Sequence, residues 1–216
     1  MALQRWPGVI VGMRAEAEIA RQFFSDVEIC GGDPELADRA ADKLIARGVS
    51  GLISFGICGG LDPELACGEL VVGTAVRGAS ETIESAWHSA FPAALARGLV
   101  YTPKKFLLEA GEKSDLHRAS GACIADMESF AVARAARGAN LPFAVLRAVA
   151  DAAAQTLPKA VIGALDAQGR PRALPVLLSL LGDPGALPQL IAAARSSRIA
   201  LDALFRRGGA LLLALA

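Results

Sequence analysis

Short apolar runs alternate with longer amphipathic stretches along the first 150 residues of the chain. Several of the apolar runs are bounded by glycine, and their length and spacing are typical of buried strands. Strands are predicted at Gly8–Met13, Val27–Cys30, Gly51–Ile57, Glu69–Val76, Gly98–Tyr101, Ala122–Ala125 and Pro142–Val149. Helical spacing predicts helices at Glu16–Phe24, Pro34–Arg47, Glu81–Arg97, Lys113–Ala119 and Glu128–Gly138. This alternation predicts an α/β fold with a central, twisted, mixed sheet that is largely parallel and flanked by helices.

The pattern changes after Asp151. Proline punctuates the rest of the chain, and leucine and isoleucine recur there at helical spacing, so we expect two or three helices that pack on the sheet. No polar linker separates this region from the rest. The chain is therefore predicted to form one domain over residues 1–216, with a core of about 8–157 and a helical C-terminal extension of about 158–216.

Composition excludes several classes of protein. The chain has 22 basic and 22 acidic residues, so its formal charge of zero offers no electrostatic surface for nucleic acid. It has no uninterrupted apolar stretch of about 18 residues that would span a membrane, and its N-terminus does not resemble a signal peptide. The four cysteines form no CxxC pair and the two histidines lie far apart, which argues against a metal site and fits a reduced, cytoplasmic location.

Candidate chemistry lies where predicted strands end. In an open α/β sheet, ligands bind beyond the carboxyl ends of the strands. Four segments there carry polar or glycine-rich sequence: Gly12–Glu16, Ser54–Leu61, Asp126–Ser129 and Arg147–Asp151.

Each of these segments also has an ordinary structural interpretation. Glu16 and Glu128 fit solvated carboxylates in the first turn of a helix, and Asp126 fits a helix cap. The glycine-rich segment from Gly56 fits a plain chain reversal, because it lacks the pattern of a known phosphate loop. Asp151 is the exception: it ends an apolar run and precedes three alanines. A carboxyl group in such surroundings is expected to have a raised pKa and to suit general-acid catalysis.

Taken together and in order, the motifs GMxxE, SFGxxGGL…GELVV, DMES and RAVAD resemble the nucleoside phosphorylase and nucleosidase superfamily. The resemblance covers about residues 8–151. Within it, the segment ISFGICGGLDP and the Leu- and Pro-rich C-terminal region are most similar to the hopanoid-associated phosphorylases. That branch is thought to release adenine from adenosylhopane. The resemblance implies an enzyme without cofactor that cleaves an N-glycosidic bond, with inorganic phosphate as a possible co-substrate.

The resemblance also implies roles for particular residues. Asp151 matches the acid that protonates N7 of the purine, Glu128 the carboxylate that binds the ribose hydroxyls, and Glu16 the residue that orients the nucleophilic water. Candidate substrate-binding residues are Met127 against the sugar, Phe106 and Leu107 at the purine, and Gly56 in the glycine-rich segment.

The sequence departs from the family's usual residues at three positions near these candidates. Ala150 replaces the Ser or Thr that usually precedes the catalytic Asp, and Ile57 replaces a frequent Ser. Ser54 stands where hexameric phosphorylases have a phosphate-binding Arg, so Arg14 is the nearest candidate for binding phosphate, or else a solvated surface charge. The sequence therefore leaves phosphate and water open as the nucleophile.

Alternatives remain open on substrate and class. A methylthioadenosine or purine nucleosidase acting on small nucleosides, or a non-catalytic nucleoside-binding module, fits the same motifs. A dinucleotide-binding fold is disfavoured because the turn after the first strand lacks the glycine triplet. For a lipid-linked nucleoside, we expect transient contact with the membrane surface and an open, apolar 5′ side. Its candidate lining positions, which also fit a helical core face, are Leu174, Leu177, Leu178 and Leu181. The resemblance further implies a homodimer or larger homo-oligomer.

Overall fold

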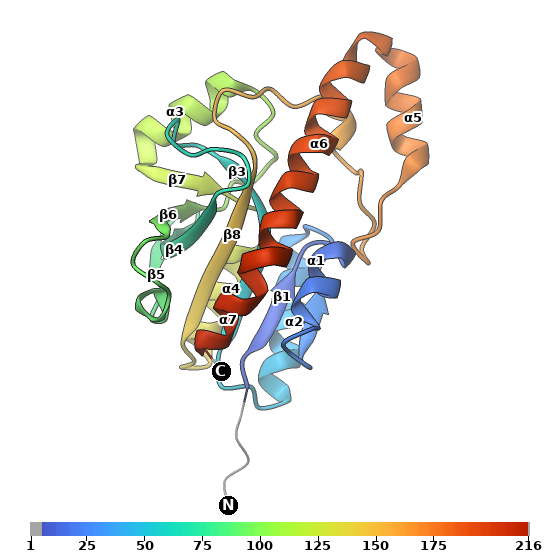
Figure 1. Ribbon diagram of the computed structural model, residues 1–216. Helices are drawn as coiled ribbons and strands as arrows, with labels where there is room; N and C mark the ends of the chain where they lie inside the picture. Colours follow the sequence, from blue (N-terminus) through green and yellow to red (C-terminus); the bar gives the residue numbers. More distant parts are fainter. Residues whose placement is uncertain (1–5, 216) are drawn as a thin grey trace, which may run out of the picture.

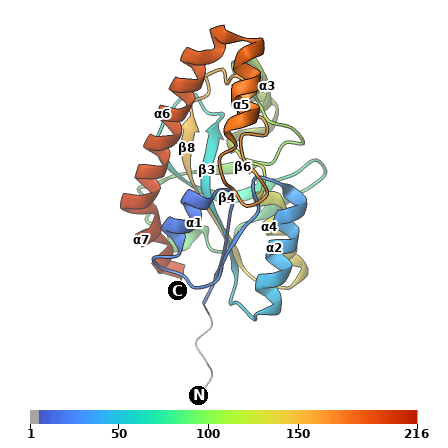
Figure 2. The same cartoon turned by 90° about the vertical axis from the view of Figure 1, so that its right-hand side faces the viewer.

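The computed structural model describes residues 6–215, with only the backbone described at positions 175 and 177–180. A mixed β-sheet forms the centre of the molecule and helices cover both of its faces (Figures 1 and 2). This is the predicted α/β architecture.

The sheet contains eight strands among the described residues. Their bounds are β1 (Gly8–Val11), β2 (Val27–Ile29), β3 (Leu52–Gly60), β4 (Leu70–Arg77), β5 (Thr82–Glu84), β6 (Ala96–Tyr101), β7 (Ala122–Ala125) and β8 (Phe143–Asp151). The order is β2-β1-β3-β7-β6-β4-β5, and β8 pairs with both β3 and β4. Because β8 joins two strands that are also linked through β7 and β6, the centre of the sheet closes into a ring of five strands.

Helices connect the strands and follow them. The α-helices are α1 (Arg14–Ala20), α2 (Pro34–Ala46), α3 (Ala110–Ser120), α4 (Ser129–Gly138), α5 (Ala173–Gly182), α6 (Leu187–Ala203) and α7 (Gly209–Leu212). Shorter helical turns are η1 (His88–Ala90), η2 (Lys159–Val161), η3 (Pro184–Ala186), η4 (Leu204–Gly208) and η5 (Leu213–Leu215), of which η4 is a π-helical turn joining α6 to α7.

Alternation along the strands divides the core between the two faces of the sheet. On β1, Ile10 packs in the cluster that contains residues of α2 and α4. Val9 and Val11 pack in the other cluster, with residues of α1 and α6. The N-terminus of α2 is fixed by Asp33, whose carboxylate accepts hydrogen bonds from the N–H groups of Glu35 and Leu36, as the sequence predicts.

The helix predicted over Glu81–Arg97 is wrong. This segment forms β5, the turn η1 and the beginning of β6 instead. Its apolar residues Ile83, Trp87, Phe91 and Leu95 recur every fourth position, which imitates a helical face. Strand pairing overrides that period, since Ile83 pairs with Val76 of β4.

The glycine-rich segment from Gly56 to Gly60 is not a turn. Strand β3 continues through it to Gly60, with an irregularity in its pairing to β8 between Cys58 and Gly59. This extension brings Gly59 opposite Asp151 at the end of β8.

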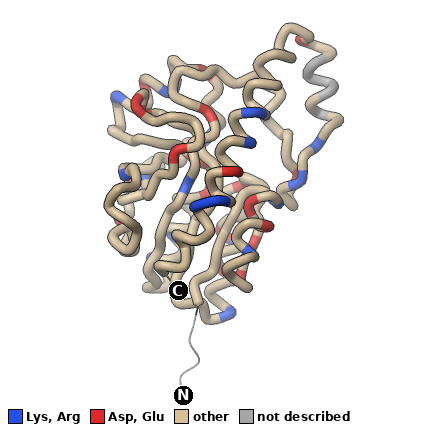
Figure 3. Tube along the Cα trace, viewed as in Figure 1, with Lys and Arg blue, Asp and Glu red and all other residues tan. Residues whose placement is uncertain are grey.

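The C-terminal helices differ in how they pack. Helix α6 runs along β8, as expected for a helix that covers the sheet, whereas α5 lies off the sheet beside the upper half of α6 (Figures 1 and 2). None of the helices within residues 6–215 is both long and apolar enough to span a membrane. Basic and acidic residues are interspersed along the chain in this view (Figure 3).

Candidate active site

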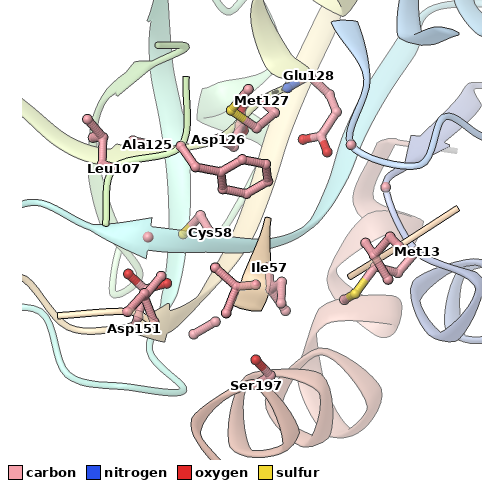
Figure 4. Close-up of a pocket in the computed structure, with 18 of the residues that line it drawn as sticks. Met13, Ile57, Cys58, Leu107, Ala125, Asp126, Met127, Glu128, Asp151 and Ser197 are labelled. Atoms are coloured by element: carbon pink, nitrogen blue, oxygen red, sulfur yellow. Dashed lines mark hydrogen bonds between the residues drawn. The ribbon is translucent and has the colours of Figure 1, made fainter. Parts of the chain in front are cut away.

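A cavity of about 270 Å³ opens where the predicted chemistry was expected, at the ends of β1, β2, β3, β6, β7 and β8. Helix α6 and the segment after β8 form its opposite side. Glu16, Glu128 and Asp151 all line it. In Figure 4 the carboxylates of Glu128 and Asp151 lie at opposite ends of the cavity, Met127 lies near Glu128, and Cys58 lies between the two ends.

Glu16 is held in the first turn of α1 by the backbone. One carboxylate oxygen accepts the N–H of Met13 at 2.8 Å, and the other accepts the N–H of Ile57 on β3 at 2.7 Å. Only 2% of Glu16 is exposed. Burial raises the pKa of Glu16, against the opposing effects of the Arg147 charge and of these backbone hydrogen bonds.

Glu128 is the residue that precedes α4, and it lies beside the loop that follows β1. A Cβ atom on Gly12 would come within 2.7 Å of Glu128 Oε1, so only glycine leaves room for this carboxylate. Its other oxygen, Oε2, accepts a hydrogen bond from Arg147 Nη2 at 3.0 Å.

Arg147 is a fully buried cation in the middle of β8. Its Nε lies 2.8 Å from Asp126 Oδ2, and Nη2 donates to Ser54 Oγ at 2.7 Å as well as to Glu128. Asp126 in turn caps α4, because its Oδ1 accepts the N–H groups of Glu128 and Ser129. The guanidinium of Arg147 thus holds the carboxylates of Asp126 and Glu128, which both lie at the start of α4, in fixed positions.

The charges in this cluster perturb one another. Burial alone would lower the pKa of the Arg147 guanidinium, but Asp126, Glu128 and Glu16 outweigh burial and raise it. Arg147 therefore stays charged. Burial, together with the negative charges of Asp126 and Glu16, raises the pKa of Glu128 to about 7 despite the opposing effect of Arg147.

Asp151 forms a second, separate charged centre at the end of β8. Its Oδ2 accepts a hydrogen bond from Lys113 Nζ of α3, a side chain that is 1% exposed. Burial raises the pKa of Asp151 to about 6, against the lowering effect of the Lys113 charge. The pKa of Asp151 is therefore close to neutral pH, where a side chain can both donate and accept a proton.

Of the remaining candidate site residues, some line the cavity and others lie outside its lining. Met127, Phe106 and Leu107 line the cavity, and 42% of Phe106 is exposed. Gly56 lies behind the lining, where a Cβ atom would come within 2.4 Å of Glu16 Oε1. Arg14 does not line the cavity: its side chain is 62% exposed and pairs with Glu18 at 3.2 Å. The structure thus favours the surface interpretation of Arg14 over phosphate binding.

Two charged residues of the site, Arg147 and Lys113, were given no role from the sequence. Arg147 is visible there only as the one charge that interrupts an apolar strand, and that interruption is the signal that points to it. Lys113 gives no such signal, because it lies in a polar helix among other charged residues. Among the described side chains, no group of three His, Cys, Asp or Glu residues is placed to hold a metal ion.

Comparison with known families finds one match. Residues 78–181, just under half of the chain, match the model of the Phosphorylase superfamily. The matched segment contains Asp126, Glu128, Arg147 and Asp151. No curated protein matches the chain.

Solved structures share the fold at low sequence identity. A 5'-methylthioadenosine/S-adenosylhomocysteine nucleosidase from Neisseria meningitidis in complex with methylthio-immucillin-A is 16% identical, with a TM-score of 0.63, over 94% of this chain and 100% of that one. An S-adenosylhomocysteine nucleosidase from Streptococcus pyogenes in complex with 5-methylthiotubericidin is 17% identical, with a TM-score of 0.62, over 96% and 99% of the two chains. A futalosine hydrolase from Helicobacter pylori is 16% identical, with a TM-score of 0.60, over 69% and 88%.

At this identity the likeness establishes the fold. The chain has the α/β fold of nucleosidases, with a mixed sheet flanked by helices and a long C-terminal helix. The family match and the fold together support the predicted class of enzyme, a nucleoside phosphorylase or N-ribosyl hydrolase.

Proposed function

We propose that this protein hydrolyses the N-glycosidic bond of an adenine nucleoside. The observation that carries the proposal is the arrangement of three carboxyl groups in one cavity. Glu16 and Glu128 both lie beside Gly12, and Asp151 lies at the opposite end from Glu128. Cleavage of such a bond needs a proton for the leaving base, stabilisation of the sugar as it becomes cationic, and a nucleophile. The three groups are spaced to divide these tasks.

Asp151 serves as the general acid. With its pKa near 6, it transfers a proton to N7 of the purine, so that the base leaves from the sugar as neutral adenine. Phe106 and Leu107 line the same cavity and provide an apolar surface for the base.

Glu128 and Glu16 act on the sugar side. Glu128 keeps one carboxylate oxygen on Arg147 and directs the other toward Gly12 and the cavity, where it accepts hydrogen bonds from the ribose hydroxyls. Glu16 orients a water molecule and takes its proton as the water oxygen bonds to C1′ of the sugar. The products are adenine and the free ribosyl compound.

The charges at the sugar end favour water over phosphate as the nucleophile. Glu16, Asp126 and Glu128 surround the single cation Arg147, and Arg147 is absent from the cavity lining. Lys113, the cationic residue in the described lining, is engaged by Asp151 at the other end. At this end of the described lining an incoming phosphate dianion would meet the carboxyl groups of Glu16 and Glu128 and no cation, which disfavours its binding.

We further propose adenosylhopane as the substrate. A lipid at the 5′ position of the ribose requires an apolar exit from the cavity. The C-terminal part of the chain contributes uncharged residues to the lining, among them Leu157, Val161, Leu165, Ala193 and Ser197. The positions predicted from sequence to line this exit support the idea less. Leu174 and Leu181 are 68% and 79% exposed on α5, and the side chains of Leu177 and Leu178 lie outside the described ones.

The test is release of adenine from adenosylhopane, methylthioadenosine and adenosine, each with and without inorganic phosphate. We expect release from adenosylhopane without phosphate and a free ribosyl product by mass spectrometry. A phosphorylated sugar product would replace hydrolysis with phosphorolysis, and faster release from methylthioadenosine would favour a small nucleoside. Binding of nucleosides without any release would indicate a binding module.

A substitution at Asp151 tests the proposed acid, and a substitution of an exposed charged residue serves as its control. Asp151→Asn is expected to lower kcat by a factor of about 10² to 10⁴, the usual contribution of a general acid, with little change in affinity. Arg14→Ala, which removes an exposed side chain, is expected to leave kcat unchanged.

We also propose that the chain forms a homo-oligomer. The feature that supports it is the exposure of several large apolar residues on α5 and the beginning of α6, namely Leu174, Leu181, Leu187 and Ile191. Large apolar side chains exposed on neighbouring elements commonly mark a protein interface.

A further inference from the structure

Lys113 is buried at the Asp151 end of the cavity, and its ammonium group is enclosed by acceptors. Nζ donates to Asp151 Oδ2, to the carbonyl of Ala152 at 3.2 Å and to the carbonyl of Gln155 at 2.8 Å. These are the three hydrogen bonds that an ammonium group can donate. The side chain of Lys113 therefore ties α3 to the chain segment that begins at Asp151.

The two oxygens of Asp151 are used differently. Oδ2 is occupied by Lys113, whereas Oδ1 accepts no hydrogen bond from the described residues. Since Asp151 lines the cavity, this arrangement leaves one oxygen of a fixed carboxyl group available to a ligand.

Few other ionisable groups face Asp151. From β3 comes Cys58 and from the segment between β3 and β4 comes Cys67, and burial raises the pKa of both thiols, which keeps them neutral. On the side of α6 the cavity is lined by Ala193 and Ser197, which do not titrate. Within the described part of the chain, Lys113 is thus the charged group that acts directly on Asp151.

We propose that Lys113 is a positioning residue that fixes Asp151 and sets its strength as an acid, an inference that rests on the proposed function for its catalytic consequence. Ala150, the residue before Asp151, has no polar side chain that could share this task.

The physical reason lies in the charge that Asp151 acquires. When Asp151 gives its proton to the purine, a carboxylate forms in a buried place, where an unpaired negative charge is costly. The Lys113 ammonium stabilises that charge as it develops, so proton transfer is easier than from a buried carboxyl group without a cation. Without Lys113, burial alone would make Asp151 a much weaker acid.

The test replaces Lys113 with methionine, which has similar length and no charge. Titration of the Asp151 carboxyl carbon by ¹³C NMR, with Asp151→Asn to identify its resonance, measures the acid directly and needs no turnover. We expect the midpoint in Lys113→Met to rise by at least one pH unit, and Lys113→Arg to remain near the wild-type value.

Kinetics supplies the second measurement. In Lys113→Met the maximum of kcat/KM should fall about tenfold, as expected for a weaker acid. Its alkaline limb should move to higher pH by the same interval as the NMR midpoint. An unchanged midpoint in the folded variant would overturn the proposal, whatever the activity. A shifted midpoint in a protein that releases no adenine would uphold the pairing and reject the proposed function.

The double variant Lys113→Met/Asp151→Asn guards against misfolding. Removal of both partners leaves no unpaired buried charge, so it should be more stable than Lys113→Met alone. If the two single losses of stability simply add, Lys113 and Asp151 are not coupled, and the proposal fails.

Discussion

The pKa of Asp151 makes a testable contribution to stability. In the folded protein this carboxyl group keeps its proton up to a pH of about 6, whereas in the unfolded chain it loses its proton near its ordinary value of 3.8. The folded state therefore binds more protons between these values, and the free energy of unfolding falls as pH rises through this window. The expected loss is about 3 kcal/mol.

Urea unfolding at pH 4, 5, 6 and 7 checks this expectation. The wild type should lose stability relative to Asp151→Asn between pH 4 and 6, and the difference should then level off. If the two proteins show parallel pH dependence, Asp151 does not titrate as described.

Gly56 is the residue on which the position of Glu16 depends most directly. Its φ of +153° is rarely adopted by other residues, and a Cβ atom would come within 2.4 Å of Glu16 Oε1 and 2.7 Å of Arg147 Nη1. We expect Gly56→Ala to destabilise the protein by about 2 kcal/mol or more, through strain and displacement of Glu16.

Thermal unfolding and kcat measure the effect of this substitution. The matched control is Gly138→Ala at the end of α4, where a Cβ atom meets nothing within 4 Å. The control should be neutral or slightly stabilising. Equal effects of the two substitutions would show that the contact with Glu16 is unimportant.

Single residues also show how far the sequence predicts the site. Glu16, Glu128 and Asp151 could be located because each follows a recognisable strand, and the ends of strands gather at one edge of a sheet. The hydrogen bond that holds Glu16 on β3 could not be predicted, because its donor is a backbone group, the N–H of Ile57. A backbone contact leaves no trace in residue type.

At the scale of elements, the segment between η2 and α5 folds over the loop after β1. The N–H of Arg14 donates to the carbonyl of Gly169 at 3.0 Å, and a Cβ atom on Gly169 would come within 2.7 Å of the carbonyl oxygen of Gly12. Leu165 from the same segment lines the cavity. This contact holds one wall of the proposed nucleoside site in place.

Gly169→Ala should therefore weaken nucleoside binding. Displacement of the segment by overpacking is expected to cost about 1–2 kcal/mol, which corresponds to roughly a tenfold rise in Kd. Isothermal titration calorimetry with an adenine nucleoside measures it.

Gly121→Ala is the matched control for backbone strain. Gly121, at the end of α3 and outside the cavity lining, has nearly the same φ, +70° against +68° for Gly169, but a Cβ atom there meets nothing within 4 Å. If both variants bind equally, backbone strain rather than the contact with Gly12 accounts for the effect.

Elements were predictable where local pattern and tertiary packing agree. Helix α2 begins at Pro34 as predicted, because the Asp33 cap is encoded locally. The error at Glu81–Arg97 arises where they disagree: residues spaced every four positions contact different partners, with Ile83 in a strand pair and Trp87 against Gly51.

At the scale of the whole molecule, pairing of β8 with both β3 and β4 is the feature that assembles the site. It places Arg147 beside Gly56 in one direction and Val71 in the other, and it brings Asp151 opposite Gly59. Strand order of this kind depends on contacts between distant segments, and such contacts cannot be inferred from the local pattern of a single sequence.

Self-association is expected through the surface formed by α5 and the beginning of α6. Leu181 is 79% exposed and Leu174 is 68% exposed, while Leu187 and Ile191 on α6 are about half exposed. Burial of each such side chain between subunits contributes about 1.5–3 kcal/mol, so a charge placed there should oppose association.

Light scattering should give a mass above that of one 22.3 kDa chain for the wild type and nearer to it for Leu181→Glu. Leu213→Glu, at a position that is 47% exposed at the other end of the C-terminal helical region, should leave the mass unchanged. A wild-type mass of one chain at micromolar concentration would contradict self-association, and an equal loss of mass in both variants would place the interface elsewhere.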